Sequence, residues 1–307
     1  MKTRYIGKPS SRIDGRVKVT GEARYAAEYN IPNLAHGCVV SSAVARGKIK
    51  AIDSSDALKL PGVLHVFTHE NRPLFSDSDE DYRDEVSPPG SPFRPIHDDQ
   101  IRYSAQPVAL VVADSFELAR YAASLVRVEY DSLPHATNLR EQLSHAYEPV
   151  PRNGIPRPPE PRGKPDEAFA GAAVRIEAEY LLPDEHHNPM ECFATTVIRD
   201  EDGRLTVYDK TQGVKNIQNY LCGVFGYSKD DLRVISPYVG GAFGSGLRPN
   251  YQVYLAVMAA HELKRSVRVF LTRQQMFTFT HRPATWQRVA LGSAGDGTLQ
   301  ALIHEAI

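Results

Sequence analysis

Residues 233–265 read RVISPYVGGAFGSGLRPNYQVYLAVMAAHELKR and predict a strand, a glycine-rich loop and a helix in direct succession. The β-branched start favours a short strand, and the apolar run from Tyr251 is typical of a buried helix. Between them, four glycines surround the aromatic residue Phe243: Gly240, Gly241, Gly244 and Gly246. Glycine adopts positive φ readily and lets backbone amides approach a ligand. In front of a helix such amides suit an anionic or oxo ligand, although a turn that serves only packing has the same pattern.

This loop differs from three common functional loops. No Gly-Lys-Ser/Thr follows it, and its glycine spacing is not Gly-x-Gly-x-x-Gly, which disfavours both usual kinds of nucleotide phosphate site. A nucleophile elbow requires the pattern Gly-x-Ser-x-Gly. Ser245 lies directly between two glycines and is followed by Leu247 and Arg248, which do not fit this pattern. The sequence therefore does not predict a serine hydrolase.

Residues 205–221, LTVYDKTQGVKNIQNYL, again predict a strand followed by an amphipathic helix. Gln212 lies where the strand gives way to the helix. A glutamine amide there can donate a hydrogen bond to a ligand oxygen without introducing charge. A simple helix cap by Thr211 explains the same segment and stays open as an alternative.

Residues 184–196, DEHHNPMECFATT, place His186, His187 and Glu191 close together in the sequence. Adjacent residues of a strand point in opposite directions, and the spacing is not that of a zinc-binding helix. A polar loop that supports a nearby site is therefore favoured over a metal held by these side chains.

Prolines and charges indicate how the chain is organised. Seven of the 22 prolines lie between Pro149 and Pro165, so residues 141–167 predict an extended linker between two domains, because proline lacks a backbone donor. Acidic residues and prolines from Asp77 to Pro95 predict a long surface loop.

Both sides of the linker mix strands and helices, so the predicted fold class is α+β. Before it, VALVV at 108–112 predicts a strand that leads into a helix capped by Asp114 or Ser115. After it, VRIEAEYLL from Val174 alternates like a half-buried strand, and LQALIHEAI at 299–307 predicts another.

Composition excludes several classes of protein. The 36 Lys and Arg residues against 37 Asp and Glu give a net charge of -1, so no overall basic field predicts a nucleic-acid partner. No apolar run approaches the ~18 residues of a membrane span, and the N-terminus lacks the apolar core of a secretion signal. The cysteines have no zinc or iron-sulfur spacing, which favours free thiols in a reduced compartment: Cys38, Cys192 and Cys222.

In this order, several motifs resemble the N-terminal part of the molybdenum-binding large subunit of the xanthine dehydrogenase and aldehyde oxidase family. The similar segments cover nearly the whole chain: SRIDGRVKVTGEARYAAEYNIP (11–32), LPGVLHVFTHEN (60–71), YSAQPVALVVADSFELARYAASLVRVEYDSLP (103–134), HHNPMECFATT (186–196), TQGVKNIQNYL (211–221), VGGAFGSGLRP (239–249) and LTRQQMFTFTHRPATWQRV (271–289).

The resemblance implies an α/β hammerhead domain over residues 1–140 and the first part of a mixed α/β molybdopterin-binding domain over 168–307. Members of the family hydroxylate an aldehyde carbon or a carbon next to a heteroatom with oxygen from water. They hold molybdenum through a pterin, in bacteria often as the cytosine dinucleotide, so no direct protein ligand to the metal is expected. Electrons then pass to iron-sulfur clusters and FAD, which are expected here on partner chains.

The resemblance also implies roles for individual residues. Gln212 is similar to the family glutamine near the molybdenum oxo ligand, and Phe243 and Gly244, with Gly241, are similar to the loop beside the metal. Leu247 stands where purine-hydroxylating members carry a glutamate, so we expect an aldehyde or N-heterocyclic substrate. Phe193 stands where the family usually has a histidine.

Family large subunits are more than twice as long as this chain. The general base and most pterin contacts are therefore expected beyond Ile307, in the remaining C-terminal part of the large subunit, and the chain alone is expected to be inactive. The alternative is a non-catalytic fragment or assembly module of such a complex. We expect a cytoplasmic protein, with export alongside a signal-bearing partner to the periplasm left open.

Overall fold

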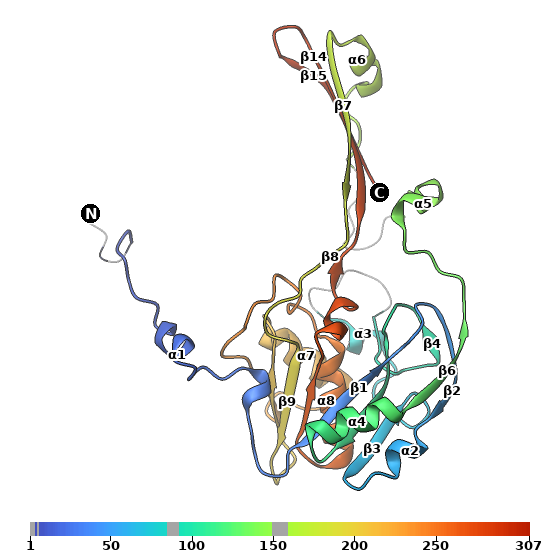
Figure 1. Ribbon diagram of the computed structural model, residues 1–307. Helices are drawn as coiled ribbons and strands as arrows, with labels where there is room; N and C mark the ends of the chain where they lie inside the picture. Colours follow the sequence, from blue (N-terminus) through green and yellow to red (C-terminus); the bar gives the residue numbers. More distant parts are fainter. Residues whose placement is uncertain (1–3, 5, 85–91, 149–158) are drawn as a thin grey trace.

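One seven-stranded sheet runs through the body of the computed structural model, which describes residue 4 and residues 6–84, 92–148 and 159–307 (Figure 1). In spatial order, its strands are β11 (Leu232–Ile235), β10 (Leu205–Asp209), β9 (Ala194–Arg199), β12 (Val267–Phe270), β1 (Ala35–Ser41), β5 (Pro107–Ala113) and β3 (Val63–Thr68). β1 pairs in parallel with β12, with Ala35 opposite Val267. Strands from both halves of the chain therefore share one sheet.

The domain limits 1–140, 141–167 and 168–307 remain predictions. Residues 149–158, which contain much of the predicted linker, lie outside the described residues. Short helical segments lie on either side of them: α5 (Leu139–Gln142), η2 (Leu143–His145) and α6 (Pro165–Gly171).

Three longer helices pack on the seven-stranded sheet: α4 (Phe116–Leu125) on β1 and β5, α7 (Val214–Phe225) on β11, and α8 (Tyr251–Leu263) on β9 and β12. All seven residues of β5 are buried, as its continuous apolar sequence requires. The Ser115 hydroxyl accepts a hydrogen bond from the Leu118 amide at 3.2 Å, which confirms Ser115 as the cap of α4. Among the described residues, no helix is long and apolar enough to cross a membrane.

The predicted acidic surface loop is only partly a loop. Residues 79–82 form the short helix α3 (Asp79–Tyr82), and Tyr82 is buried against the rings of Tyr220 and Tyr254. Burial of this aromatic ring stabilises a turn of helix that charge repulsion alone would disfavour. Residues 85–91 of the same predicted loop lie outside the part of the chain that the structure describes.

The remaining elements of the body are short. They are α1 (Gly15–Val19), η1 (Ala26–Glu28), α2 (Ser55–Leu58), η3 (Gln274–Phe277), and a sheet of β4 (Gln100–Ile101), β2 (Gly47–Asp53) and β6 (Arg127–Ser132). A two-stranded ladder, β8 (Glu185–His186) with β13 (His281–Arg282), leads from the body to a separate sheet.

That separate sheet, together with α6, is called the arm and stands out from the body (Figure 1). It consists of β15 (Leu299–Ala306), β14 (Thr285–Ser293) and β7 (Val174–Leu182). The expectation that β7 is half-buried is wrong for this chain, because every residue of it except Ala178 is exposed.

The strand register explains this exposure. Ile176, Leu291 and Leu302 lie opposite one another across the three strands and therefore share one face. Neighbouring positions on that face add Val174, Tyr180, Leu182 and Leu299, all exposed. The opposite face carries Arg288, which forms ion pairs with Glu177 at 2.7 Å and Glu305 at 3.2 Å, and packs against α6. Within the described residues, nothing covers the apolar face of the arm.

Candidate functional site

The two segments that the sequence singled out meet at one edge of the large sheet. β10 and β11 are parallel, from Leu205 opposite Leu232 to Tyr208 opposite Ile235. Gln212 follows β10, and the loop of residues 240–247 follows β11, so both come from the carboxyl ends of neighbouring parallel strands. Ligand sites of α/β sheets commonly lie at such an edge.

Gln212 is tied directly to the end of the glycine loop. Its backbone amide donates to the Gly246 carbonyl at 2.8 Å, and its side-chain Oε1 accepts from the Gly246 amide at 3.3 Å. The side chain is exposed, and its amide nitrogen forms no hydrogen bond with any described residue. With Oε1 engaged, the free end of Gln212 is a neutral hydrogen-bond donor.

The alternative prediction, a helix cap by Thr211, is wrong, because the N-cap of α7 is Gly213 and no side chain forms a cap hydrogen bond there. The buried hydroxyl of Thr211 accepts from the Gly213 amide at 3.0 Å and donates to the Gly246 carbonyl at 3.0 Å. Thr211 therefore holds the turn before α7 against the end of the glycine loop, and the side chain of Gln212 stays exposed.

The glycine loop exposes an aromatic ring and a stretch of backbone. Gly241, Phe243 and Gly244 have φ values of 89°, 56° and 94°. A positive φ is uncommon for phenylalanine, and such strain often accompanies functional sites. Phe243 is 65% exposed, and a Cβ built on Gly244 would meet only open space, so the backbone there is accessible. Leu247 is exposed beside them.

Three ionisable residues lie beneath this surface: Asp209 and Lys210 are buried, and Glu191 is half-buried. Sequence reasoning assigned no role to Asp209 and Lys210. Burial raises the pKa of the Asp209 carboxyl to about 6, although its Oδ1 accepts from Thr195 at 2.5 Å and Gln252 at 3.4 Å. Burial lowers the pKa of the Lys210 ammonium to about 8, against the opposing effects of Glu191 and Asp209. The sequence offered no local signal for these two residues, because their burial depends on the elements that pack around them.

Glu191 supports the glycine loop. Its Oε2 accepts from the Gly240 amide at 2.6 Å, and its own amide donates to the Gly240 carbonyl at 3.0 Å. Burial raises the pKa of the Glu191 carboxyl, while the Gly240 amide and the Lys210 ammonium act in the opposite direction. Residues 184–196 were expected to form a polar loop that supports a nearby site. Glu191 gives such support to the glycine loop.

The two histidines of that segment do not converge with it. His186 lies on β8 opposite His281, and His187 Nδ1 is 3.1 Å from the Thr280 carbonyl. In the residues that the structure describes, no group of three His, Cys, Asp or Glu side chains could hold a metal ion.

The donor set fits a metal centre held by an organic cofactor. An oxo or dithiolene group needs neutral donors and accessible backbone, and the edge supplies the Gln212 amide and the open backbone at Gly244. The exposed Phe243 and Leu247 add an apolar border. These residues would meet such a group without coordinating the metal.

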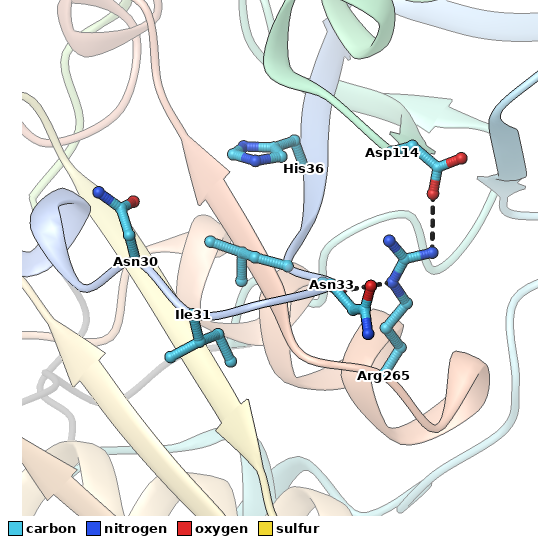
Figure 2. A pocket seen from close by; sticks show the side chains of 7 residues that line it. Asn30, Ile31, Asn33, His36, Asp114 and Arg265 are labelled. Carbon is cyan, nitrogen blue, oxygen red and sulfur yellow. Dashed lines mark hydrogen bonds and ion pairs between the residues drawn. The ribbon is translucent and has the colours of Figure 1, made fainter.

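A cavity of about 780 Å³ lies at the opposite edge of the sheet (Figure 2). It adjoins the starts of β1 and β12 and is lined by Asn30, Ile31, Asn33, Leu34, His36, Asp114 and Arg265. Arg265, one of its lining residues, donates to Asp114 at 2.8 Å and to the Asn33 carbonyl at 2.7 Å. This ion pair joins the two halves of the chain and lies apart from Gln212.

Two family models match most of the chain. Residues 20–134 match the a/b hammerhead domain of aldehyde oxidase and xanthine dehydrogenase, and residues 147–307 match the molybdopterin cofactor-binding domain. The chain is 36% identical to the aldehyde oxidoreductase molybdenum-binding subunit PaoC of Escherichia coli O157:H7, over 98% of this chain and 40% of that protein.

Two further relatives are more distant. A probable xanthine dehydrogenase subunit of Bacillus subtilis is 30% identical over 88% of this chain and 35% of its own length. The solved aldehyde oxidoreductase of Desulfovibrio gigas superposes with a TM-score of 0.79 at 26% identity, over 96% of this chain and 33% of that one. The chain spans about two fifths of the length of the first of these relatives, the PaoC protein. It combines a hammerhead domain with a molybdopterin-binding domain and belongs to the molybdenum-binding large-subunit family of the aldehyde oxidases and xanthine dehydrogenases.

Proposed function

We propose that this chain forms one wall of the molybdenum site in a hydroxylase that oxidises aldehydes or N-heterocycles. The observation that carries the proposal is the link between Gln212 and Gly246, which leaves a neutral amide donor fixed beside an exposed glycine backbone. The molybdopterin cofactor, when bound, supplies a centre that takes two electrons from the substrate and delivers an oxygen derived from water. Gln212, Gly241, Phe243 and Gly244 would hold it.

The contribution of this chain is positioning. The Gln212 amide stabilises a ligand oxygen by hydrogen bonding, and it transfers no proton because an amide does not titrate in this range. Its orientation is fixed before the reaction by the hydrogen bond that Oε1 accepts from Gly246. Phe243 and Leu247 offer apolar surface that excludes water and contacts a flat substrate. The general base would come from outside this chain.

The substrate preference follows from Leu247. Its side chain is exposed at the end of the loop and offers no hydrogen bond to a polar purine edge. Each unsatisfied polar group of a bound purine costs about 1–3 kcal/mol. Aromatic aldehydes should therefore be turned over far better than hypoxanthine by the complete enzyme, measured by dye-linked oxidation of both. Equal activity on hypoxanthine would contradict the role of Leu247.

Partners follow from the apolar face of the arm. We propose that the remaining part of the large subunit covers this face, and that iron-sulfur and FAD subunits receive the electrons. Exposed apolar patches rimmed by polar residues are typical of interaction surfaces.

The free cysteines Cys38, Cys192 and Cys222 support a cytoplasmic complex.

Substitution of Gln212 tests the function directly. In the complete complex, Gln212→Ala should lower turnover by on the order of 10²-fold, because one preorganised donor to the reacting oxygen is lost. Molybdenum content, measured on the same sample, should stay unchanged. The matched control is Gln300→Ala, an exposed glutamine on the arm, which should leave turnover intact.

Two results would overturn the proposal. One is unchanged turnover of Gln212→Ala at full molybdenum occupancy, which would leave Gln212 as a loop residue only. The other is the absence of molybdenum and pterin from a complex that contains this chain with all its partners.

A further inference from the structure

We propose that Arg273 is a positioning residue of the molybdenum site that acts through the turn of residues 188–190. Its guanidinium binds this turn, and the next residue of the chain, Glu191, binds the glycine loop at Gly240. The inference rests on the proposed function, because it assigns Arg273 a role toward that site. It concerns the end of the loop opposite to the one that Gln212 holds.

The guanidinium of Arg273 makes three hydrogen bonds to the turn. Nη1 donates to Asn188 Oδ1 at 2.7 Å and to the Pro189 carbonyl. Nη2 donates to the Met190 carbonyl at 2.6 Å. Because a guanidinium presents its donors as a rigid planar fork, the three bonds together fix the directions of these oxygen atoms.

The turn itself has few other constraints. Asn188 has a positive φ of 37°, which is uncommon for residues other than glycine, and Pro189 has no backbone N–H to donate. The side chains of Asn188 and Met190 are exposed, whereas Pro189 is buried. The hydrogen bonds from Arg273 and the burial of Pro189 therefore set the position of the turn.

The turn and Glu191 lie directly against the glycine loop. The Glu191 amide donates to the Gly240 carbonyl at 3.0 Å, and Glu191 Oε2 accepts from the Gly240 amide at 2.6 Å. A Cβ built on Gly240 would lie only 2.6 Å from Glu191 Cβ. A Cβ built on Gly241 would lie 3.4 Å from Pro189 Cβ. Movement of the turn would therefore break both hydrogen bonds to Gly240.

The backbone that carries Arg273 is anchored on both halves of the chain. The Leu271 amide donates to the Phe193 carbonyl at 2.9 Å, just before β9. Gln275 is buried, and its side-chain amide donates to the Val39 carbonyl of β1 at 2.9 Å. Arg273 therefore reaches the turn from a fixed position on the seven-stranded sheet.

The two ends of the glycine loop are held separately. Gln212 Oε1 accepts from the Gly246 amide, whereas Glu191 Oε2 accepts from the Gly240 amide. A binding site needs its backbone held in one conformation by such surrounding contacts. Loss of Arg273 should therefore loosen the loop at Gly240 and leave the end at Gly246 in place.

Hydrogen exchange at single amides, read by mass spectrometry, tests this role in the complex in which the chain is purified. Arg273→Gln should speed exchange of the Glu191 and Gly240 amides by about ten-fold or more, because local opening frees them. The Gln212 amide, which donates to the Gly246 carbonyl at 2.8 Å, should exchange as in wild type. Unchanged exchange at Gly240, or equal acceleration of all three amides, would overturn the assignment.

Arg265 provides the matched control. Its guanidinium also donates to a backbone carbonyl, that of Asn33 at 2.7 Å, but it lies at the opposite edge of the sheet. Arg265→Gln should leave exchange of the Glu191 and Gly240 amides unchanged. Faster exchange there would show that the loop responds to the loss of a remote arginine, and the specific role of Arg273 would be rejected.

The double variant R273Q/E191A tests whether Arg273 acts through Glu191. E191A alone removes the acceptor of the Gly240 amide and should speed its exchange. Adding R273Q should change the exchange of this amide no further, because both substitutions interrupt the same route. An effect equal to the product of the two single effects would overturn the proposed route.

A conservative variant keeps the test decisive if Arg273→Gln does not fold. Lysine retains the charge but lacks the planar fork, so Arg273→Lys should also speed exchange of the Glu191 and Gly240 amides. Wild-type exchange in a folded R273K variant would overturn the role of the three hydrogen bonds.

Kinetics of the complete complex separate a positioning role from a purely structural one. Arg273→Gln should lower kcat by about ten-fold at unchanged molybdenum content, because small displacements of a site are costly to turnover. KM should stay unchanged, since Leu247 lies at the end of the loop that keeps its contacts. Unchanged kcat with faster exchange at Gly240 would leave Arg273 with a structural role only.

The exchange result is independent of the proposed chemistry, because exchange needs no turnover. Faster exchange of the Gly240 amide in R273Q, in a complex that lacks molybdenum, would leave Arg273 positioning the loop while the proposed function fails. Conversely, slow turnover of Gln212→Ala with unaltered exchange in R273Q would leave the function standing and the role of Arg273 rejected.

Discussion

The seven-stranded sheet and the arm both contain strands with apolar residues but differ in what covers those residues. Each residue of β5 is buried, between α4 and neighbouring strands, whereas nearly every residue of β7 is exposed. α6 packs on one face of the arm, and the face with Ile176 and Leu302 has no partner among the described residues. An apolar strand pattern therefore shows which face can be buried, and packing decides whether it is.

The two regions also differ in how they use charge. The arm carries Arg288 with Glu177 and Glu305 at its surface, and such exposed ion pairs add little stability. The body places Asp209 and Lys210 beneath the candidate site, where burial shifts both pKa values toward the neutral forms. Buried charge in the body therefore costs stability, whereas the exposed ion pairs of the arm change it little.

The largest expected effect is a difference in the free energy of unfolding when a leucine is replaced by alanine in the body and in the arm. Leu255 of α8 is fully buried, and Leu255→Ala should lower the free energy of unfolding by about 2–5 kcal/mol through the cavity it leaves. Leu302 of β15 is 57% exposed, and Leu302→Ala should change the free energy of unfolding by less than about 0.5 kcal/mol. Denaturant unfolding of the same preparation measures both. Similar losses at the two positions would break the comparison.

The next effect concerns how the free energy of unfolding depends on pH. Asp209 in the body and Glu177 in the arm should change it in opposite directions as the pH rises. The pKa of Asp209 is raised to about 6, so its carboxyl is protonated in the folded chain at pH values where the unfolded chain is already ionised. Wild type should therefore lose stability relative to Asp209→Asn as pH rises from 4 to 6, by up to about 3 kcal/mol.

Glu177 provides the contrast. Its hydrogen bond with Arg288 lowers the pKa of the carboxyl, so its contribution is lost as pH falls. Glu177→Gln should differ from wild type only weakly, and the difference should shrink toward acid pH. Thermal unfolding from pH 4 to 8 measures both series, and a flat difference for D209N would contradict the burial of a shifted carboxyl.

The smallest effect on stability is expected on the apolar face of the arm. The double variant I176S/L302S should leave the unfolding free energy of the chain nearly unchanged, since both residues are already exposed, at 63% and 57%. It should nevertheless weaken association with the remaining part of the large subunit by ten-fold or more, as truncation at an interface does. The control E177S/E305S alters the opposite face, and equal losses of association in both variants would count against the assignment of the face.

The sequence determined the local features. The order of strand, loop and helix on both sides of Gln212 and the glycine loop follows from hydrophobic periodicity and from the φ freedom of Gly241 and Gly244. The cap at Ser115 follows from its side chain, which can reach the first amides of α4. The residues of the candidate site were found because they lie in two short segments at strand ends.

Only the tertiary structure decided the features that join distant residues. Ala35 meets Val267 in one sheet, and Glu191 reaches Gly240 from another loop. The burial of Lys210 and the exposure of β7 each depend on which elements pack nearby, and no local pattern encodes this. Periodicity is set by neighbours along the chain, whereas burial is set by neighbours in space. In the described residues, packing buries Asp209 and Lys210 under the candidate site and leaves the apolar face of the arm exposed.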